Sequence, residues 1–249
     1  MSPAAPRWLA APADVTLSAG AVHVWRVALS WPPAQLPSLL SLLSPEERER
    51  AARFRFPRGY RRFIVSHAAL RDILARYLSR APQSLLFETN AYGKPFLAGD
   101  DSWLHFNLSH SGEWALVAVT SLGPVGVDVE QVRDDFSGEA IARRFFSPSE
   151  VEAFLALPPE LRTQGFFSCW TRKEAFIKAV GMGVSFALDG FAVSLHPDEQ
   201  PRVLWVRDNP QEADSWSLLD LRPGPGYAAA LAIRAKPHQV SLWQWQTPR

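Results

Sequence analysis

The chain has 249 residues, of which 47% are hydrophobic and 20% charged, and its formal net charge is +1. This composition is that of a folded protein with a real core, and it excludes a disordered chain or one whose overall field selects a polyanionic partner. The single cysteine, Cys169, excludes a disulfide framework and favours a reducing compartment. No apolar run reaches the ~20 residues of a membrane span, and the start lacks a signal-peptide pattern. We expect a cytoplasmic protein without a membrane partner.

The predicted elements begin after a loose, Pro/Ala-rich extension at residues 1–20. Residues 21–29 alternate as in a half-buried strand. A capping box then opens a helix, with Ser44 as the N-cap and Glu47 three residues later. Residues 63–78 carry apolar side chains at helical spacing, which predicts a second, longer helix.

The same signals recur in the second half of the chain. Three landmarks lie 103 residues after their counterparts: Trp25 and Asp128, Ser44 and Ser147, and His67 and Trp170. Three features in one order at one offset indicate a duplicated unit. We therefore expect an α+β fold of two similar α/β halves, residues 21–123 and 124–249, related by a pseudo-twofold axis. A groove between such halves suits a ligand.

The segment GVDVE at residues 126–130 places two acids on one face of a predicted strand, because side chains two residues apart share a face. Val127 and Val129 would then face the core. The pair alone fits either a solvated strand face or a site for a hard cation such as Mg²⁺.

A predicted helix at residues 169–183 could supply a third carboxylate. Glu174 and Lys178 are four residues apart and share a face. Such a pair is also common on ordinary amphipathic helices. The duplication favours a site, since it makes GVDVE and this helix parts of the same half.

Three further stretches fit phosphate binding as well as ordinary loops or surfaces. Residues 109–112 are predicted to form a polar Ser-His-Ser-Gly turn, and residues 92–95 a turn with one cation, Lys94. Residues 46–62 are rich in arginine, which fits a solvated helix face, a phosphate grip or a nucleic-acid patch.

Taken in order, five stretches resemble the Sfp-type 4′-phosphopantetheinyl transferases. They are SPEERERAARF, YGKP, FNLSHSG, GVDVE and WTRKEAFIKAVGMG, and they span residues 44–183. The last two are the most specific, because the family combines a G-x-D-x-E strand with a W-x-x-K-E-x-x-x-K helix some forty residues later. The family is also built of two similar halves with the site between them.

The resemblance implies a holo-[acyl-carrier-protein] synthase type of activity. Coenzyme A would donate its 4′-phosphopantetheine arm to a serine of an apo acyl or peptidyl carrier protein, and 3′,5′-ADP would leave. Mg²⁺ would be the cofactor. An enzyme with both halves in one chain needs no second copy, so we expect a monomer.

The resemblance also implies residue roles. The metal ligands would be Asp128, Glu130 and Glu174. The catalytic residues would be Lys178 and Glu174, the latter as general base either directly or through a metal-bound water. The residues binding coenzyme A would be Arg50, Arg53, Lys94, Ser109, His110 and Lys178. At one position the chain departs from the pattern, because Glu47 stands where some members have lysine.

Two alternatives make different demands on the sequence. Another Mg²⁺-dependent phosphate-transferring or phosphate-hydrolysing enzyme could use the same carboxylates, but the chain has no G-x-x-x-x-G-K-[ST] loop. A nucleic-acid-binding module could use the arginine-rich stretch, but the near-neutral charge and the lack of a recognition signature oppose it. We expect no nucleic-acid partner.

Overall fold

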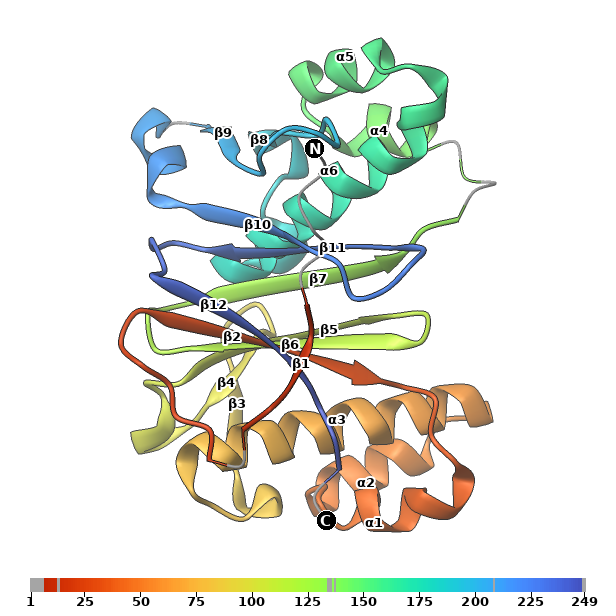
Figure 1. Ribbon diagram of the computed structural model, residues 1–249, viewed down its shortest axis with the longest axis vertical. Helices are drawn as coiled ribbons and strands as arrows, with labels where there is room; N and C mark the ends of the chain where they lie inside the picture. Colours follow the sequence, from red (N-terminus) through yellow and green to blue (C-terminus); the bar gives the residue numbers. More distant parts are fainter. Residues whose placement is uncertain (1–6, 13, 134–135, 137, 208, 248–249) are drawn as a thin grey trace.

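The computed structural model describes residues 7–12, 14–133, 136, 138–207 and 209–247. Its elements form two lobes, stacked one on the other in Figure 1. The elements before residue 124 are β1 (Leu9–Ala10), β2 (Ala21–Ala28), α1 (Leu36–Leu40), α2 (Pro45–Ala52), α3 (Pro57–Leu78), β3 (Phe87–Thr89), β4 (Pro95–Leu97), β5 (His105–Ser111) and β6 (Trp114–Thr120). Those after it are β7 (Val125–Gln131), α4 (Glu139–Phe145), α5 (Pro148–Ala156), α6 (Pro159–Val180), β8 (Phe191–Val193), β9 (Val203–Val206), β10 (Ser217–Leu221), β11 (Tyr227–Ile233) and β12 (Gln239–Gln244).

The two lobes repeat one plan. Each lobe contains three antiparallel strands in the same order, β2-β6-β5 in one sheet and β7-β11-β10 in the other. In each set the strand that comes last in the chain lies in the middle. Each lobe also has a long helix of 22 residues, α3 or α6, and a two-stranded hairpin, β3–β4 or β8–β9. The predicted α+β fold with two similar halves is confirmed.

The local sequence signals produce the expected helix starts. The side chains of Ser44 and Ser147 each accept a hydrogen bond from the backbone N–H of the glutamate three residues later, and each glutamate carboxylate accepts one from the serine backbone N–H. The long helices begin earlier than predicted, at Pro57 and Pro159, because proline is well suited to the first turn of a helix. Helix α6 ends at Val180, followed by Gly181 with a φ of 79°, a conformation that glycine adopts without strain.

Strand β7 lies between two different environments. Val127 and Val129 are buried in an apolar core between the two sheets, as the alternation predicts. The opposite face lies under α6, where a Cβ on Gly126 would collide with the backbone of Ala175. Asp128 belongs to this second face. The acids of GVDVE therefore face the long helix of their own lobe.

The chain ends outside the lobe in which it was expected to end. Strand β12 pairs in parallel with β2, and β1 pairs with β12, so both extend the sheet of the N-terminal lobe. Figure 1 shows β12 running from the C-terminal lobe toward the helices of the N-terminal lobe, where the chain ends. The predicted division at residue 124 remains a prediction, and it did not anticipate this pairing.

Part of the predicted N-terminal extension contacts the N-terminal lobe. Leu9 and Ala10 form β1, and Val15 is buried in the N-terminal core. Residues 1–6 and 13 of the predicted extension lie outside the described residues. Among the helices of the described part of the chain, none is both long and apolar enough to cross a bilayer.

Candidate active site

The two lobes meet where β5 and β7 run side by side. Polar side chains of β5 bridge this junction: the Asn107 side chain accepts from the Val127 amide at 2.8 Å, and the Ser109 hydroxyl donates to Asp128 at 2.9 Å. One step further along, Ser111 donates to Glu130 at 2.8 Å. The FNLSHS and GVDVE stretches, which the sequence singled out separately, are thus in direct contact.

Asp128 lies at the centre of the junction and is only 3% exposed. Its Oδ1 accepts from Ser109 and from the Lys178 ammonium, whose Nζ lies at 2.5 Å. Its Oδ2 is also buried, and it has no hydrogen-bond partner among the described residues. Burial raises the pKa of Asp128, while Lys178 acts in the opposite direction. The carboxylate therefore has unused acceptor capacity in a site of restricted solvent access.

Two further carboxylates share the charge of this site. Burial, and then the neighbouring Asp128 charge, raises the pKa of Glu130 above its ordinary value. The same two causes, in the same order, raise the pKa of Glu174 on α6. Lys178 lowers both pKa values, but by less. The cluster is thus short of positive charge.

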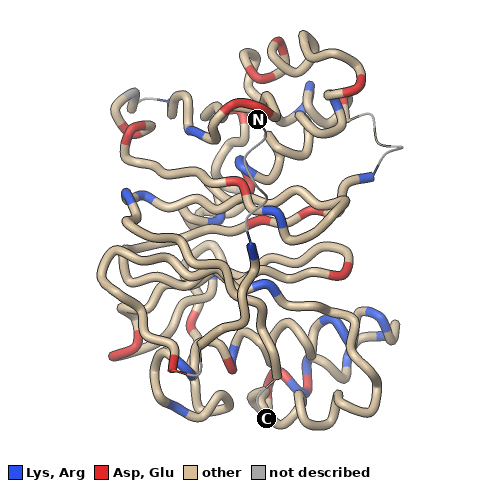
Figure 2. The backbone as a smooth tube through the Cα atoms, in the orientation of Figure 1, with Lys and Arg blue, Asp and Glu red and all other residues tan. Residues whose placement is uncertain are grey.

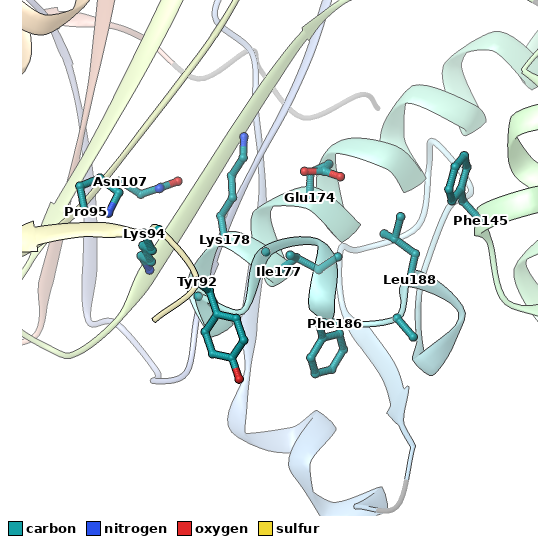
Figure 3. Close-up of a pocket in the computed structure, with 14 residues that line it drawn as sticks. Tyr92, Lys94, Pro95, Asn107, Phe145, Glu174, Ile177, Lys178, Phe186 and Leu188 are labelled. Carbon is teal, nitrogen blue, oxygen red and sulfur yellow. The ribbon is translucent and has the colours of Figure 1, made fainter. Parts of the chain in front are cut away.

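A cavity of about 520 Å³ opens beside these residues, a volume in the range of small-molecule sites. Figure 3 shows Glu174 and Lys178 on α6, between the Tyr92–Pro95 turn of the N-terminal lobe and apolar side chains of the C-terminal lobe. The apolar wall consists of Phe145, Ile177, Phe186 and Leu188. Both lobes therefore line the cavity, as the duplicated sequence predicted.

A cationic surface lies beyond β5. Figure 2 shows basic residues gathered along α2 and the start of α3. The Arg50 guanidinium lies 5.3 Å from the centre of the Phe63 ring, and Phe63 stacks on His67 with ring centres 3.9 Å apart. Burial lowers the pKa of His110, and the positive charge of Arg62 lowers it further. His67 is close enough to Arg50 and His110 for both to lower its pKa.

This cluster contains two of the predicted coenzyme A contacts, Arg50 and His110, and one residue that sequence reasoning missed. His67 entered the sequence analysis only as a landmark of the repeat. His67 lies one helical turn after Phe63, so the sequence could have indicated that the two side chains share a face of α3. In the structure this face lies beside Arg50. Arg53 follows α2 and is exposed.

Lys94 departs from the arrangement expected of a ligand-binding lysine. It lines the cavity, but its ammonium donates to the carbonyl oxygens of Val125 at 3.1 Å and Ala179 at 3.3 Å. Burial lowers the pKa of Lys94 to about 8. Its predicted contact with coenzyme A remains a prediction.

The predicted metal site can be tested on its donor chemistry. Within the described residues, no three His, Cys, Asp or Glu side chains are gathered closely enough to hold an ion. The positive charge beside Asp128 is instead supplied by Lys178. However, the buried Oδ2 of Asp128 has no hydrogen-bond partner among the described residues, and carboxylate oxygens are donors that suit Mg²⁺. The residues fit the metal, and its binding remains a prediction.

Fold and site together define a two-lobed α+β protein with an acidic site at the lobe junction. Residues 124–232 match the 4′-phosphopantetheinyl transferase superfamily, and residues 29–122 match the N-terminal domain of 4′-phosphopantetheinyl transferase. The chain belongs to the 4′-phosphopantetheinyl transferase superfamily.

Individual relatives agree with this assignment. The 4′-phosphopantetheinyl transferase HetI of a Nostoc species is 39% identical over 241 residues, which cover 96% of this chain and 98% of HetI. The 4′-phosphopantetheinyl transferase Sfp of Bacillus subtilis is 35% identical over 77% of this chain and 82% of its own length. The L-aminoadipate-semialdehyde dehydrogenase-phosphopantetheinyl transferase of Xenopus laevis is 30% identical over 68% of this chain and 60% of its own length. The resemblance to Sfp-type enzymes and the predicted class of enzyme, a 4′-phosphopantetheinyl transferase, are confirmed.

Proposed function

We propose that this protein transfers the 4′-phosphopantetheine arm of coenzyme A to a serine of an apo acyl or peptidyl carrier protein and releases 3′,5′-ADP. This is the holo-[acyl-carrier-protein] synthase type of reaction. The observation that carries the proposal is the contact of Asp128 with Lys178 and Ser109 beside a cavity lined by both lobes. In this arrangement, a buried acid and a cation from different elements meet beside a cavity that a pyrophosphate could enter.

Asp128, Glu130 and Glu174 would hold Mg²⁺. When bound, the metal would polarise the pyrophosphate and offset its negative charge as a Lewis acid. The unpartnered Oδ2 of Asp128 supports this assignment.

Glu174 and Lys178 would act on the reacting groups. Glu174 lines the cavity, and its raised pKa brings the carboxylate closer to the basicity that a general base needs near neutral pH. Its carboxylate would accept the proton of the carrier serine, whose oxygen then attacks the phosphorus next to the pantetheine arm. The Lys178 ammonium would stabilise the negative charge that develops on the leaving phosphate.

The cationic surface beyond β5 would bind the nucleotide end of coenzyme A. Arg50 and His110 would contact its phosphates there, with His67 as their neighbour. The predicted contact of Ser109 would lie at the lobe junction, where its hydroxyl donates to Asp128. Charge-assisted hydrogen bonds from arginine suit phosphate oxygens. Arg53 and Lys94 belong to the predicted contacts too, but Arg53 is exposed after the end of α2 and the Lys94 ammonium donates to two backbone carbonyls.

The remaining features of the proposal concern the setting of the reaction. We propose a cytoplasmic, monomeric enzyme whose partners are coenzyme A and a carrier protein, without a nucleic-acid or membrane partner. The inclusion of both lobes of the groove in one chain supports the monomer.

The direct test is incubation with coenzyme A, Mg²⁺ and a panel of apo carrier proteins, followed by mass spectrometry of the carriers. We expect one carrier serine to gain one phosphopantetheine group and 3′,5′-ADP to appear in equal amount. Release of a coenzyme A fragment without any modified carrier would instead favour a phosphate-hydrolysing enzyme.

Asp128→Asn tests the site itself. We expect transfer to fall by at least about 100-fold, because the neutral amide cannot replace the carboxylate, while thermal unfolding stays within a few degrees of wild type. Asp189→Asn is the matched control, since Asp189 is an exposed acid paired with Arg207 on the C-terminal lobe. Near-normal turnover in Asp128→Asn would show that this carboxylate has no part in the reaction.

A further inference from the structure

The carboxyl end of α6 lies against the turn between β3 and β4, which belongs to the other lobe. The last carbonyl groups of a helix have no donor within the helix and need one from elsewhere. The Asn90 side-chain amide donates to the Gly181 carbonyl at 2.8 Å, and the Lys94 ammonium donates to the Ala179 carbonyl at 3.3 Å. The end of α6 is therefore capped by side chains of the N-terminal lobe.

Lys94 joins two elements of the site at once. Besides Ala179, its ammonium donates to the carbonyl of Val125, the first residue of β7, at 3.1 Å. Strand β7 carries Asp128, and α6 carries Glu174 and Lys178. A positive charge at a helix carboxyl end is also favourable toward the helix dipole.

The turn is built to hold these two side chains in place. The Asn90 side-chain oxygen accepts from the amides of Tyr92 and Lys94, both at 2.9 Å, so Asn90 is fixed within its own turn while its amide group reaches Gly181. Gly93 adopts a φ of 84°, which closes the turn. The turn therefore presents its donors to α6 in a preset arrangement.

The two surfaces fit closely. A Cβ on Gly181 would lie 3.1 Å from Lys94 Cδ and 3.3 Å from Asn90 Nδ2, tighter than ordinary contact. A side chain larger than that of glycine at this position would therefore press on the turn.

We propose that Asn90 and Lys94 are positioning residues, which cap α6 across the lobe junction and thereby set Glu174 and Lys178 against Asp128. The effect on catalysis rests on the proposed function, whereas the cap itself does not. The assignment also gives Lys94 a role other than the predicted contact with coenzyme A.

Asn90→Ala and Lys94→Met test the cap by hydrogen exchange of the ligand-free protein. We expect amides from Ile177 to Gly181 to exchange at least tenfold faster in both variants, because each substitution leaves helix carbonyls without a donor. Lys236→Met is the matched control: Lys236 donates to the carbonyl of Trp216 within the C-terminal lobe, so its loss should leave exchange at the α6 end unchanged. Unchanged exchange in either cap variant would overturn the cap.

Steady-state kinetics test the positioning role. We expect both cap variants to lower kcat at least fivefold with KM for coenzyme A changed less than twofold. An unaltered kcat would overturn the role. So would a tenfold rise in KM for coenzyme A in Lys94→Met alone, since that pattern identifies a ligand contact. If the wild-type protein modified no carrier, the proposed function would fail, and hydrogen exchange would still decide the cap.

Discussion

Gly126 is needed for the approach of α6 to β7. A Cβ at this position would collide with the Ala175 carbonyl oxygen and the Ala179 backbone nitrogen, both of which belong to the helix above. Helix backbone, unlike a flexible side chain, cannot move aside alone. Gly126, the first residue of GVDVE, therefore allows α6 to pack close enough to β7 for Lys178 to contact Asp128.

Replacement of Gly126 by alanine should destabilise the protein by about 2 kcal/mol or more, because α6 must shift away from the strand. Urea unfolding measures this loss. Gly190→Ala is the control, since an added Cβ there meets nothing nearer than 3.7 Å and should change the unfolding free energy by less than about 1 kcal/mol. Equal effects of the two substitutions would contradict the close packing.

His67 makes stability depend on pH. Burial lowers the pKa of His67 to about 4, below its ordinary value of 6.5. The unfolded chain therefore binds a proton as the pH falls below about 6.5, whereas the folded protein does not, so stability present at pH 7 is lost toward pH 4.

His67→Gln removes this titration. Between pH 7 and pH 4.5, the wild-type protein should lose about 2 kcal/mol more unfolding free energy than the variant. Urea titrations of both proteins at the two pH values provide the measurement. Parallel losses would mean that another group dominates acid destabilisation in this range.

At the level of elements, the duplication extends to a buried ion pair. Glu150 closes the capping box of α5 and also accepts from Lys173 of α6 at 2.7 Å. In the N-terminal lobe, Glu47 closes the box of α2 and accepts from Arg71, which occupies the same position along α3. The acid at position 47 thus holds α2 onto α3.

The two ion pairs should contribute differently to the free energy of unfolding. Lys173 and Glu150 are both almost fully buried, whereas the Glu47 side chain keeps 17% of its exposure. Glu150→Gln leaves a buried ammonium without its anion and should destabilise the protein by about 3–5 kcal/mol. Glu47→Gln should destabilise it by about half as much or less. Unfolding in urea would compare them, and the reverse order would contradict the role of burial.

At the level of the whole molecule, the C-terminal segment links the two lobes, because it follows the last strand of the C-terminal lobe and packs on the N-terminal lobe. Trp245 follows β12 and is buried in the core of the N-terminal lobe, where its indole donates to Asp72 at 2.8 Å. Trp25, the counterpart of Asp128, faces the same core. The position equivalent to Asp128 is therefore occupied by apolar packing in the N-terminal lobe.

Trp245→Ala should destabilise the protein by about 3–5 kcal/mol, because it leaves a large cavity in this core. Trp245→Phe retains most of the packing but loses the bond to Asp72, so its loss should be about 1–2 kcal/mol. Thermal or urea unfolding measures both. A Trp245→Ala variant as stable as wild type would show that the end of the chain does not hold the lobe.

The sequence by itself determined the local and repeated features. Capping boxes depend on residues three apart, strand faces on alternation, and the duplication on a constant offset, so each can be found without knowing what packs where. The acids of GVDVE, Glu174 and Lys178 were found in this way, and their ordered motifs identified the family.

The tertiary structure decided what depends on contacts between distant segments. It brought Asp128 within reach of Ser109 and Lys178, added β12 to the other lobe's sheet, and engaged Lys94 with two carbonyl groups. Backbone carbonyls are present at every residue, so no sequence pattern marks which ones a lysine will meet. The depth to which Asp128 is buried, and with it the pKa of its carboxyl group, likewise follows from the helix that covers it.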